Sequence, residues 1–253
     1  MVVSIHQPDY ISYLGYFYKM SKSDIFVFLD DCQFSNNNMH HWNRIKTPQG
    51  ELRLKIPVEQ HFGDHINQVR TKDELEWKQK HLKTIEMNYR KAKFFNDIFS
   101  EFQKLLLKQY SNLAQMNIEI NSWIGKKFGF RAKFMQASCM CINTVSEERV
   151  IDIVKKIGGD TYISGIGAKA YEVDEHFVRQ GINIIYTDYQ PISYPQLWNR
   201  VGFLPYMSVL DYLFNCGFDW EYIQYEVKRM NDEKTNGNRK LYRDAVSFRK
   251  RIL

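Results

Sequence analysis

The sequence lacks an apolar run long enough to cross a membrane, and it lacks a signal peptide. A membrane-spanning helix needs about 18 or more consecutive apolar residues, and no segment of the 253 residues comes near that length. The apolar start, residues 1–5, is too short for a signal peptide and is followed directly by His6. We therefore expect a cytoplasmic protein with no membrane span.

Cysteine is scarce, and its spacing excludes two common kinds of site. The four cysteines have neither the spacing of a disulfide framework nor that of a zinc site. We expect reduced thiols, which are usual in the cytosol. His61 and His65 have H-x3-H spacing, but Gly63 between them disfavours the helix that would align the two rings. No metal site is predicted.

The common signatures of nucleotide and hydrolase chemistry are also missing. There is no GxSxG, no Walker A motif and no dinucleotide fingerprint, so the cofactor stays unknown. Residues 19–23 spell KMSKS, an ATP-binding signature of class I aminoacyl-tRNA synthetases. They end the first predicted helix, whereas the signature follows the last strand of those enzymes' nucleotide domain. We interpret this match as chance.

Positive charge is concentrated near the C-terminus. From Gln224 onward there are nine Lys and Arg and four Asp and Glu, so this segment holds five of the six net positive charges. The rest of the chain is nearly neutral, which argues against a polyanion-binding surface on its body. The tail is either a solvated basic segment or one that contacts RNA or a membrane surface.

The first thirty residues have the pattern of a strand–helix–strand unit, which is typical of a parallel sheet. Residues 1–5 and 25–29 are short apolar runs, as buried strands are. Between them, apolar side chains recur at the i, i+3, i+4 and i+7 spacing of one helix face, namely Tyr13, Tyr16, Phe17 and Met20.

The rest of the chain predicts one α/β domain with an insertion. A turn at residues 47–50 suggests a hairpin, and residues 71–130 have the apolar spacing of three helices. The α/β pattern then resumes, with a helix after a capping-box sequence that begins at Thr144. Later elements are expected at residues 162–164 and 182–187 (strands), and at 170–180 and 205–215 (helices). We predict a Rossmann-like, mostly parallel sheet within residues 1–220, a helical layer at about 71–130, and a basic tail at 221–253.

Polar side chains follow both strands of the first unit. His6 and Gln7 follow the first strand, and Asp30 and Asp31 follow the second. Because parallel strands have their carboxyl ends at one edge, where such sheets bind ligands, we expect a site there. The imidazole of His6 suits acid–base chemistry, or it simply bonds a neighbouring carbonyl. The carboxylates can hold a metal, orient His6, receive a substrate amine or cap a turn.

Two other segments add candidates for anion binding. Asn43 and Arg44 lie in a polar segment, and the planar fork of arginine fits a carboxylate or phosphate; an exposed surface arginine is the alternative. Ser164 is followed by Gly165 and Gly167 after a predicted strand. Glycines there let backbone N–H groups approach an anion, or they form a tight turn.

Several segments resemble the signature of the WbqC-like proteins. The resemblance covers about residues 3–218 and is most specific in its first blocks. The motifs are IHQPDY (residues 5–10), LGYF (14–17), LDDCQF (29–34), NRIKT (43–47), IPV (56–58), YISG (162–165), YPQ (194–196) and SVLDYLFN (208–215), with Trp77 and His81. Ser12-Tyr13 stands where the family more often has Pro-Trp, and Cys32 where it more often has Val.

The resemblance implies a bacterial enzyme of surface-polysaccharide biosynthesis, such as O-antigen synthesis. It implies transfer of an amino-acid or other acyl group from an activated donor to the amine of an amino sugar, in a nucleotide-linked form. On this hypothesis His6 is the base or polarises the acyl carbonyl, Asp30 orients it or receives the amine, and Arg44 holds an anion. The substrate-binding candidates are Gln7, Tyr10, Asp31, Gln33, Asn43, Lys46, Ser164, Gly165, Gly167 and Gln196.

Two alternatives stay open. The N-terminal order of elements is similar to the start of pantothenate synthetase and related nucleotidylyl-transferring enzymes, which implies an ATP-dependent ligase. In that family the helix begins with H-x-G-H, whereas both histidine positions are tyrosine here, Tyr13 and Tyr16. The other alternative is a non-catalytic binding protein of a glycan pathway.

Overall fold

The computed structural model describes residues 1–170 and 172–232. The chain divides into two compact units, Met1–Phe218 and the segment that begins at Asp219. In the second unit, residues 220–232 are helical. Most of the basic tail, residues 233–253, lies outside the described residues, so its contact with RNA stays a prediction. No helix in the described part of the chain is long and apolar enough to cross a membrane.

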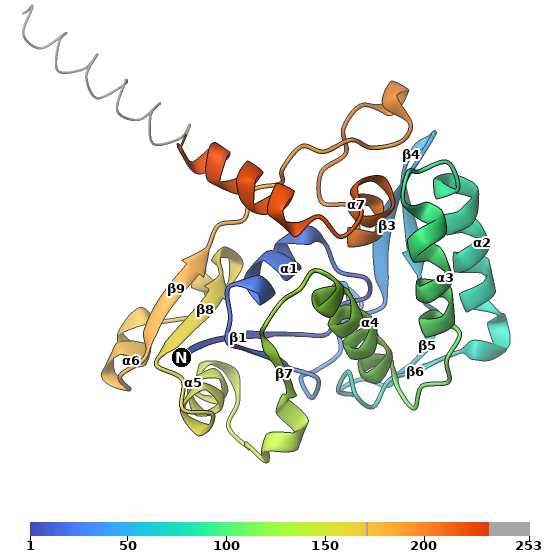
Figure 1. Cartoon of the computed structure of the whole chain (residues 1–253). Coiled ribbons are helices and arrows are strands. Elements are labelled where there is room, and N and C mark those ends of the chain that lie inside the picture. Colours follow the sequence, from blue (N-terminus) through green and yellow to red (C-terminus); the bar gives the residue numbers. More distant parts are fainter. Residues whose placement is uncertain (171, 233–253) are drawn as a thin grey trace, which may run out of the picture. The chain divides into compact units, whose positions relative to one another are not determined.

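Five parallel strands form the central sheet of the first unit (Figure 1). Every neighbouring pair in this sheet is parallel. The predicted α/β class with a mostly parallel sheet is therefore confirmed. The strands lie in the order β7 (Lys133–Gln136), β2 (Ile25–Phe28), β1 (Val2–His6), β8 (Thr161–Gly165) and β9 (Asn183–Thr187).

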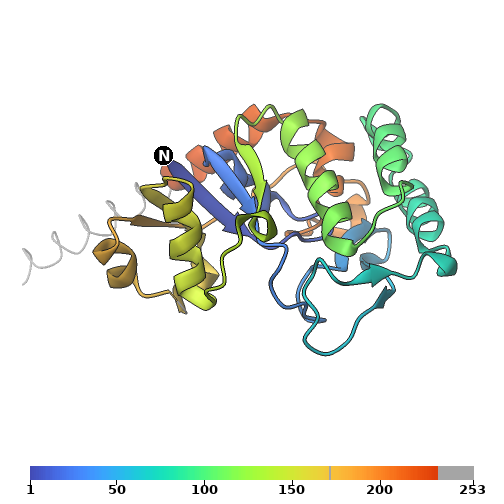
Figure 2. The same ribbon diagram turned by 90° about the horizontal axis from the view of Figure 1, so that it is seen from below.

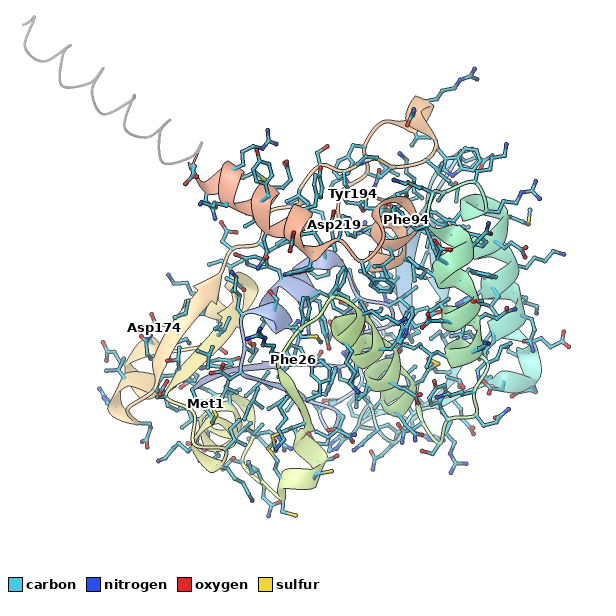
Figure 3. All side chains as sticks on the ribbon, in the orientation of Figure 1. Met1, Phe26, Phe94, Asp174, Tyr194 and Asp219 are labelled. Carbon is cyan, nitrogen blue, oxygen red and sulfur yellow. The ribbon has the colours of Figure 1, made fainter. Side chains whose placement is uncertain are left out.

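The direction in which strands are added reverses between β1 and β8. From β1 the chain adds β2 and β7 on one side, and then returns to add β8 and β9 on the other. Where the connections that follow two neighbouring strands run to opposite sides of the sheet, a crevice opens at the carboxyl ends of those strands. Met1, labelled in Figure 3, precedes β1 at the amino ends of the strands. Its ammonium lies 2.6 Å from Asp160.

Helices cover both faces of the sheet, because side chains alternate along the buried strands. Val3 and Val27 pack on one face against Phe177 and the α5 side chains. Phe26 packs on the other face against Tyr16, and Figure 2 shows α4 and α5 on opposite sides of the strands. The first face holds α5 (Ser146–Lys156) and α6 (Asp174–Arg179), and the second holds α1 (Leu14–Ser21) and α4 (Leu113–Lys127).

The remaining elements of the first unit are an antiparallel hairpin and further helices. The hairpin, β3 (Trp42–Thr47) and β4 (Gly50–Lys55), turns between Thr47 and Gly50 as predicted. The expected three helices within residues 71–130 are present, as α2, α3 and α4. Helices α2 and α7 pack on β3, and α3 packs on α4 and α7. The bounds are α2 (Trp77–Tyr89), α3 (Phe95–Leu106), α7 (Val209–Cys216), and the short pair β5 (Val58–Glu59) and β6 (Arg70–Thr71).

The predicted capping box of helix α5 is not formed. Helix α5 is preceded by Val145, and no side chain caps it. The capping box fails because both of its polar residues bond elsewhere. The hydroxyl of Thr144 donates to Asp152 (2.8 Å), and Glu147 accepts from the backbone N–H of Val173 (2.5 Å).

Candidate active site

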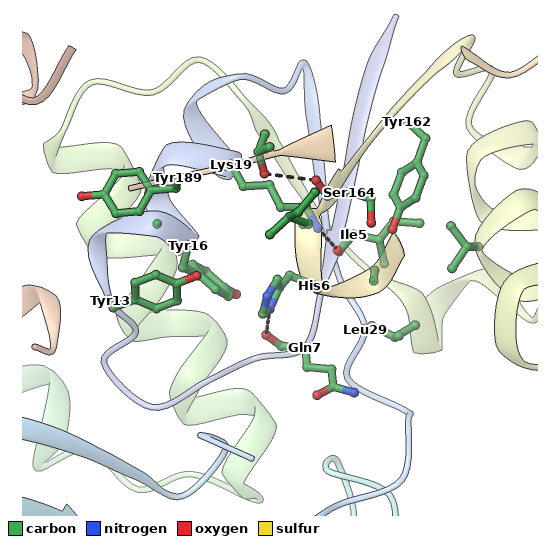
Figure 4. Close-up of a pocket in the computed structure, with 17 residues that line it drawn as sticks. Ile5, His6, Gln7, Tyr13, Tyr16, Lys19, Leu29, Tyr162, Ser164 and Tyr189 are labelled. Atoms are coloured by element: carbon green, nitrogen blue, oxygen red, sulfur yellow. Dashed lines mark hydrogen bonds between the residues drawn. The ribbon is translucent and has the colours of Figure 1, made fainter. Parts of the chain in front are cut away.

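A cavity of about 400 Å³ opens at the carboxyl ends of β1 and β8, where the strand order reverses. This is the position at which parallel α/β sheets bind small molecules. Figure 4 shows the cavity with His6, Lys19 and four tyrosines around it. It is lined by Ile5, His6, Gln7, Tyr13, Gly15, Tyr16, Lys19, Leu29, Val150, Tyr162, Ser164, Gly165, Ile166, Gly167, Ala168, Thr187 and Tyr189.

His6 ends β1 and presents a neutral imidazole to this cavity. Its Nδ1 lies 3.1 Å from the carbonyl oxygen of Gln7. Because a carbonyl only accepts, we assign the proton to Nδ1, which leaves the lone pair on Nε2. Burial and the nearby Lys19 ammonium lower the pKa of His6 to about 3. The ring is therefore neutral at physiological pH, with Nε2 unprotonated.

Asp9 is the carboxyl group beside His6, with its Oδ2 4.0 Å from His6 Nδ1. The residue is 7% exposed, and burial raises the pKa of Asp9 to about 7. Its charge also acts on the cavity residues Tyr13 and Tyr16. Asp9 was not among the candidates, although it lies on the same turn as His6, which was the available signal.

Lys19 is another residue that the sequence did not identify, and unlike Asp9 it lines the cavity. It lies on α1 and is only 5% exposed, and its Nζ donates to the carbonyl of Ile5 (2.7 Å). The β1–β8 pairing ends at Ser4 and Ile163, so this ammonium sits where the two strands separate. Burial lowers the pKa of Lys19 to about 8, although Glu172 nearby opposes that shift. In the sequence, Lys19 lies one helical turn beyond Tyr16 on the apolar face of the helix. This position was the available signal for a buried lysine.

Tyrosine rings form much of the cavity wall. Tyr16 makes an edge contact with the His6 ring, with centroids 4.7 Å apart. Tyr13 and Tyr189 also contact each other, at 6.3 Å. Both of these rings pack over Gly15, where a Cβ atom would lie 2.3 Å from Tyr13 and 2.8 Å from Tyr189. Glycine at this helical position therefore lets two phenols line one side of the cavity.

The loop that carries His6 into α1 is held by buried asparagines. Asn117 donates to the carbonyl of Pro8 (2.9 Å), and Asn121 donates to that of Asp9 (2.7 Å), both from α4. Asn43 donates to the carbonyls of Tyr10 and Ile11, each at 2.9 Å. Ile11 has a φ of 36°, which costs a β-branched residue strain. These bonds hold a strained turn in place.

Five of the predicted site residues line the cavity. They are His6, Gln7, Ser164, Gly165 and Gly167. The amide oxygen of Gln7 lies 2.7 Å from His40 Nε2, which fixes that side chain. Ser164 is buried at the end of β8, and the glycines follow it. The prediction was that the polar residues at the ends of β1 and β2 come together, whereas the cavity combines residues at the ends of β1 and β8.

The second predicted polar cluster does not reach His6. Asp30 accepts hydrogen bonds from the backbone N–H and the hydroxyl of Ser138, at 3.0 and 2.6 Å. Asp31 forms an ion pair with Arg149. Asp9, rather than Asp30, is the carboxyl beside His6. Gln33 is exposed and forms an isolated bridge with His65.

The other predicted residues are engaged in structural contacts away from the cavity. The Tyr10 hydroxyl bonds His81 Nδ1 (3.0 Å). Arg44 pairs with Glu51 across the hairpin (2.9 Å), so it does not hold a ligand in the cavity. Asn43 supports the loop described above.

Lys46 and Gln196 belong to a second buried network, centred on Asp211. Gln196 donates to Asp211 (2.7 Å), which also accepts from Tyr89 (2.7 Å). The ammonium of Lys46 donates to the carbonyl of Gly202 (2.5 Å). Burial raises the pKa of Asp211. This network joins α2, α7 and the segment before α7, and none of its members lines the cavity.

The described residues contain no group of three His, Cys, Asp or Glu side chains that could hold a metal ion.

Comparison with known proteins places the chain in a family. Rv1507c, an uncharacterised protein of Mycobacterium tuberculosis, is 29% identical over 228 residues, which cover 88% of this chain and 97% of the relative. No solved structure matches the chain significantly. The family model that matches residues 7–222 describes the WbqC-like proteins, and it spans the cavity residues from Gln7 onward. This chain belongs to the WbqC-like protein family.

Proposed function

We propose that this protein is a transferase that acylates the amine of an amino sugar. The observation that carries the proposal is a neutral His6 with Asp9 4.0 Å away, in a tyrosine-walled cavity at the carboxyl edge of a parallel sheet. Acyl transfer to an amine needs a group that takes a proton from nitrogen as the new bond forms. The unprotonated Nε2 of His6 can do this.

The chemical steps follow from these two residues. The amine nitrogen attacks the acyl carbon, and the N–C bond forms while His6 Nε2 takes the amine proton. An ionised Asp9 stabilises the resulting imidazolium, much as the carboxylate of a catalytic triad does. The bond to the leaving group of the donor then breaks, and His6 returns the proton to that group. No net oxidation or reduction occurs.

The cavity wall suits a sugar. Tyrosine rings offer apolar faces together with hydroxyl groups, and Tyr13, Tyr16 and Tyr189 supply both. The amide of Gln7 and the hydroxyls of Ser164 and Thr187 add polar groups. The finer assignment, to a nucleotide-linked amino sugar of bacterial surface-polysaccharide biosynthesis, rests on what the family implies rather than on the cavity.

A product assay by mass spectrometry tests the proposal. The full chain is incubated with nucleotide-linked amino sugars and with acyl-CoA, aminoacyl-tRNA, or a free amino acid plus ATP. We expect one donor to add the mass of its acyl group to the amino sugar, and nothing to be added to the matched sugar with a hydroxyl in place of the amine. Lack of product with every donor would instead favour a non-catalytic binding protein.

A second candidate is an ATP-dependent ligase. The Lys19 ammonium and the glycines after β8 lie at the crevice where Rossmann-like sheets hold nucleotide phosphates. This candidate predicts ATP consumption and pyrophosphate release that depend on the acceptor. Product formation from a preactivated donor without ATP would exclude it.

A further inference from the structure

Lys19 is a buried cation with unused hydrogen-bonding capacity. Its ammonium can donate three hydrogen bonds, and the carbonyl of Ile5 accepts one of them. Within the described residues, no carboxylate lies within ion-pair distance of Lys19. The aromatic ring of Tyr162 is 5.9 Å from Nζ and offers a weak cation–π contact.

A buried ammonium with a single carbonyl acceptor is energetically unfavourable unless a ligand supplies a negative charge or further acceptors. Taking an ammonium out of water costs several kcal/mol, which a single carbonyl does not offset. Buried charges with perturbed titration therefore tend to mark functional sites. Lys19 lines the cavity, so an anion there would reach the ammonium.

The charges around the cavity indicate which anion fits. Among the described residues that line it, Lys19 is the sole Lys or Arg, and none is Asp or Glu. His6 contributes no charge at neutral pH. A phosphate monoester carries about −1.5 to −2 at pH 7, whereas one ammonium matches the single charge of a carboxylate.

We infer that Lys19 binds the carboxylate of a small-molecule substrate in this cavity, either a free amino acid or a sugar acid. The inference uses the cavity of the proposed function and names the charge of one of its substrates. A diphosphate of a nucleotide-linked sugar would then lie outside this cavity.

Glu172 carries a negative charge that acts on Lys19, and it therefore offers a second variant for the test. Its Oε1 accepts from the Tyr162 hydroxyl (3.2 Å), and its Oε2 is buried with no hydrogen-bond partner in the described residues. The Glu172 charge interacts with Lys19. It therefore competes with a ligand carboxylate for the same ammonium. Removing each charge should change affinity in opposite directions.

Equilibrium binding to the full chain, measured by ligand-observed NMR or calorimetry, tests the inference. The probes are glycine, alanine and glucuronate, their neutral amides, and inorganic phosphate. We expect at least one carboxylate to bind about tenfold or more tightly than its amide. K19M should weaken that binding by about tenfold to a hundredfold, and E172Q should strengthen it by roughly twofold to fivefold. K22M, which removes an exposed charge at the end of the same helix, should change nothing.

Several results of this binding experiment would overturn the inference. Equal binding of acids and amides, unchanged binding by K19M, or no binding by any acid would overturn it. Weaker binding by E172Q would show a structural effect rather than charge competition and would also overturn it. Tighter binding of phosphate than of every carboxylate would assign the site to a phosphate group instead. This experiment measures binding and not turnover, so its result does not depend on whether the proposed acyl transfer occurs.

Discussion

At the scale of single residues, the site is a set of ionisable groups that burial shifts in different directions. Burial raises the pKa of Asp9 to about 7 and lowers the pKa of His6 to about 3. It also lowers the pKa of Lys19 to about 8. Groups whose pKa values are displaced by a shared environment are typical of catalytic sites. The same displacement has a cost in stability that can be measured.

The stability of the protein should fall as Asp9 ionises. Its pKa in the folded state, about 7, is above the ordinary 3.8, so folding favours the protonated carboxyl. The stabilisation is complete below pH 4 and is lost as pH rises through 7. We expect D9N to be more stable than the wild type by roughly 2–4 kcal/mol at pH 8, and the gap to shrink toward pH 4. Denaturant unfolding at pH 4, 6 and 8 checks this; a gap independent of pH would contradict it.

The D9N variant should be less active than the wild type, although it is more stable. If ionised Asp9 stabilises the His6 imidazolium, the wild-type rate rises with pH through about 7. D9N should be slower by about tenfold or more and lose that rise. A variant with more stability and less activity is the usual signature of a strained functional group. An unchanged pH–rate profile in D9N would show that Asp9 acts only in folding.

The sequence identified some site residues and not others, for physical reasons. His6 and Ser164 could be predicted because polar residues at the ends of parallel strands meet at one edge. The role of Asp30 could not, because its partner Ser138 is 108 residues away. The partner of Arg44, Glu51, is 7 residues away across the hairpin. Lys19 was missed because a buried lysine and a solvated one look alike in a sequence.

At the scale of elements, the loop between β1 and α1 is the part that positions His6 and Asp9. Asn117 and Asn121 hold its carbonyls from α4, one helical turn apart, and are fully buried. Asn43 holds the strained turn at Ile11 from the hairpin. Catalytic groups on a loop need such support to stay in place. The loop is thus tied to two elements that follow it in sequence.

Loss of the loop contacts made by Asn117 should lower both the free energy of unfolding and the activity. Asn117 donates to the carbonyls of Pro8 and His40, at 2.9 and 2.7 Å. N117A leaves both carbonyls buried without their donor, at a cost of about 1–3 kcal/mol each. We expect a drop of roughly 2–5 kcal/mol in the free energy of unfolding and a loss of activity at temperatures where the variant is still folded.

N96A, which changes an exposed asparagine on α3, is the matched control and should behave like the wild type. Full activity in folded N117A would mean that the loop holds its shape without α4.

Periodicity predicted most elements but not their arrangement. The apolar runs at β1 and β2 and the spacing in α1 were sufficient to locate those elements. Helix α7 begins at Val209 rather than at 205, because the Ser208 side chain accepts from Leu210 N–H and caps it (3.3 Å). The position of β7 at the sheet edge could not be predicted, because its four residues lack a strong pattern. Strand order depends on packing between distant segments.

At the scale of the whole molecule, the strand order of the sheet determines where the cavity opens. The reversal between β1 and β8 separates two strand ends, and α1 brings Lys19 and Tyr16 to the gap. Residues within 5–29 and 150–189 thereby line one cavity, although more than a hundred residues separate the two segments. The inserted helix α4 stabilises this cavity through its loop contacts.

A ligand of this cavity should stabilise the folded chain. At about 100 times its dissociation constant, a ligand adds about 2.7 kcal/mol to the free energy of unfolding. For a protein of this size, that corresponds to a rise of roughly 5–10 °C in Tm. We expect this rise with the carboxylate that binds most tightly, and a smaller one with K19M at the same ligand concentration. Equal rises in both proteins would place the ligand elsewhere.

The most direct test of the catalytic account is the acylation rate of His6 and His65 variants. The initial rate of amino-sugar acylation is measured for the wild type, H6A and H65A, with unfolding curves to confirm that each variant is folded. We predict that H6A is slower by about a hundredfold or more, and that H65A, which lacks an exposed histidine outside the cavity, matches the wild type. A folded H6A protein as fast as the wild type would contradict the account.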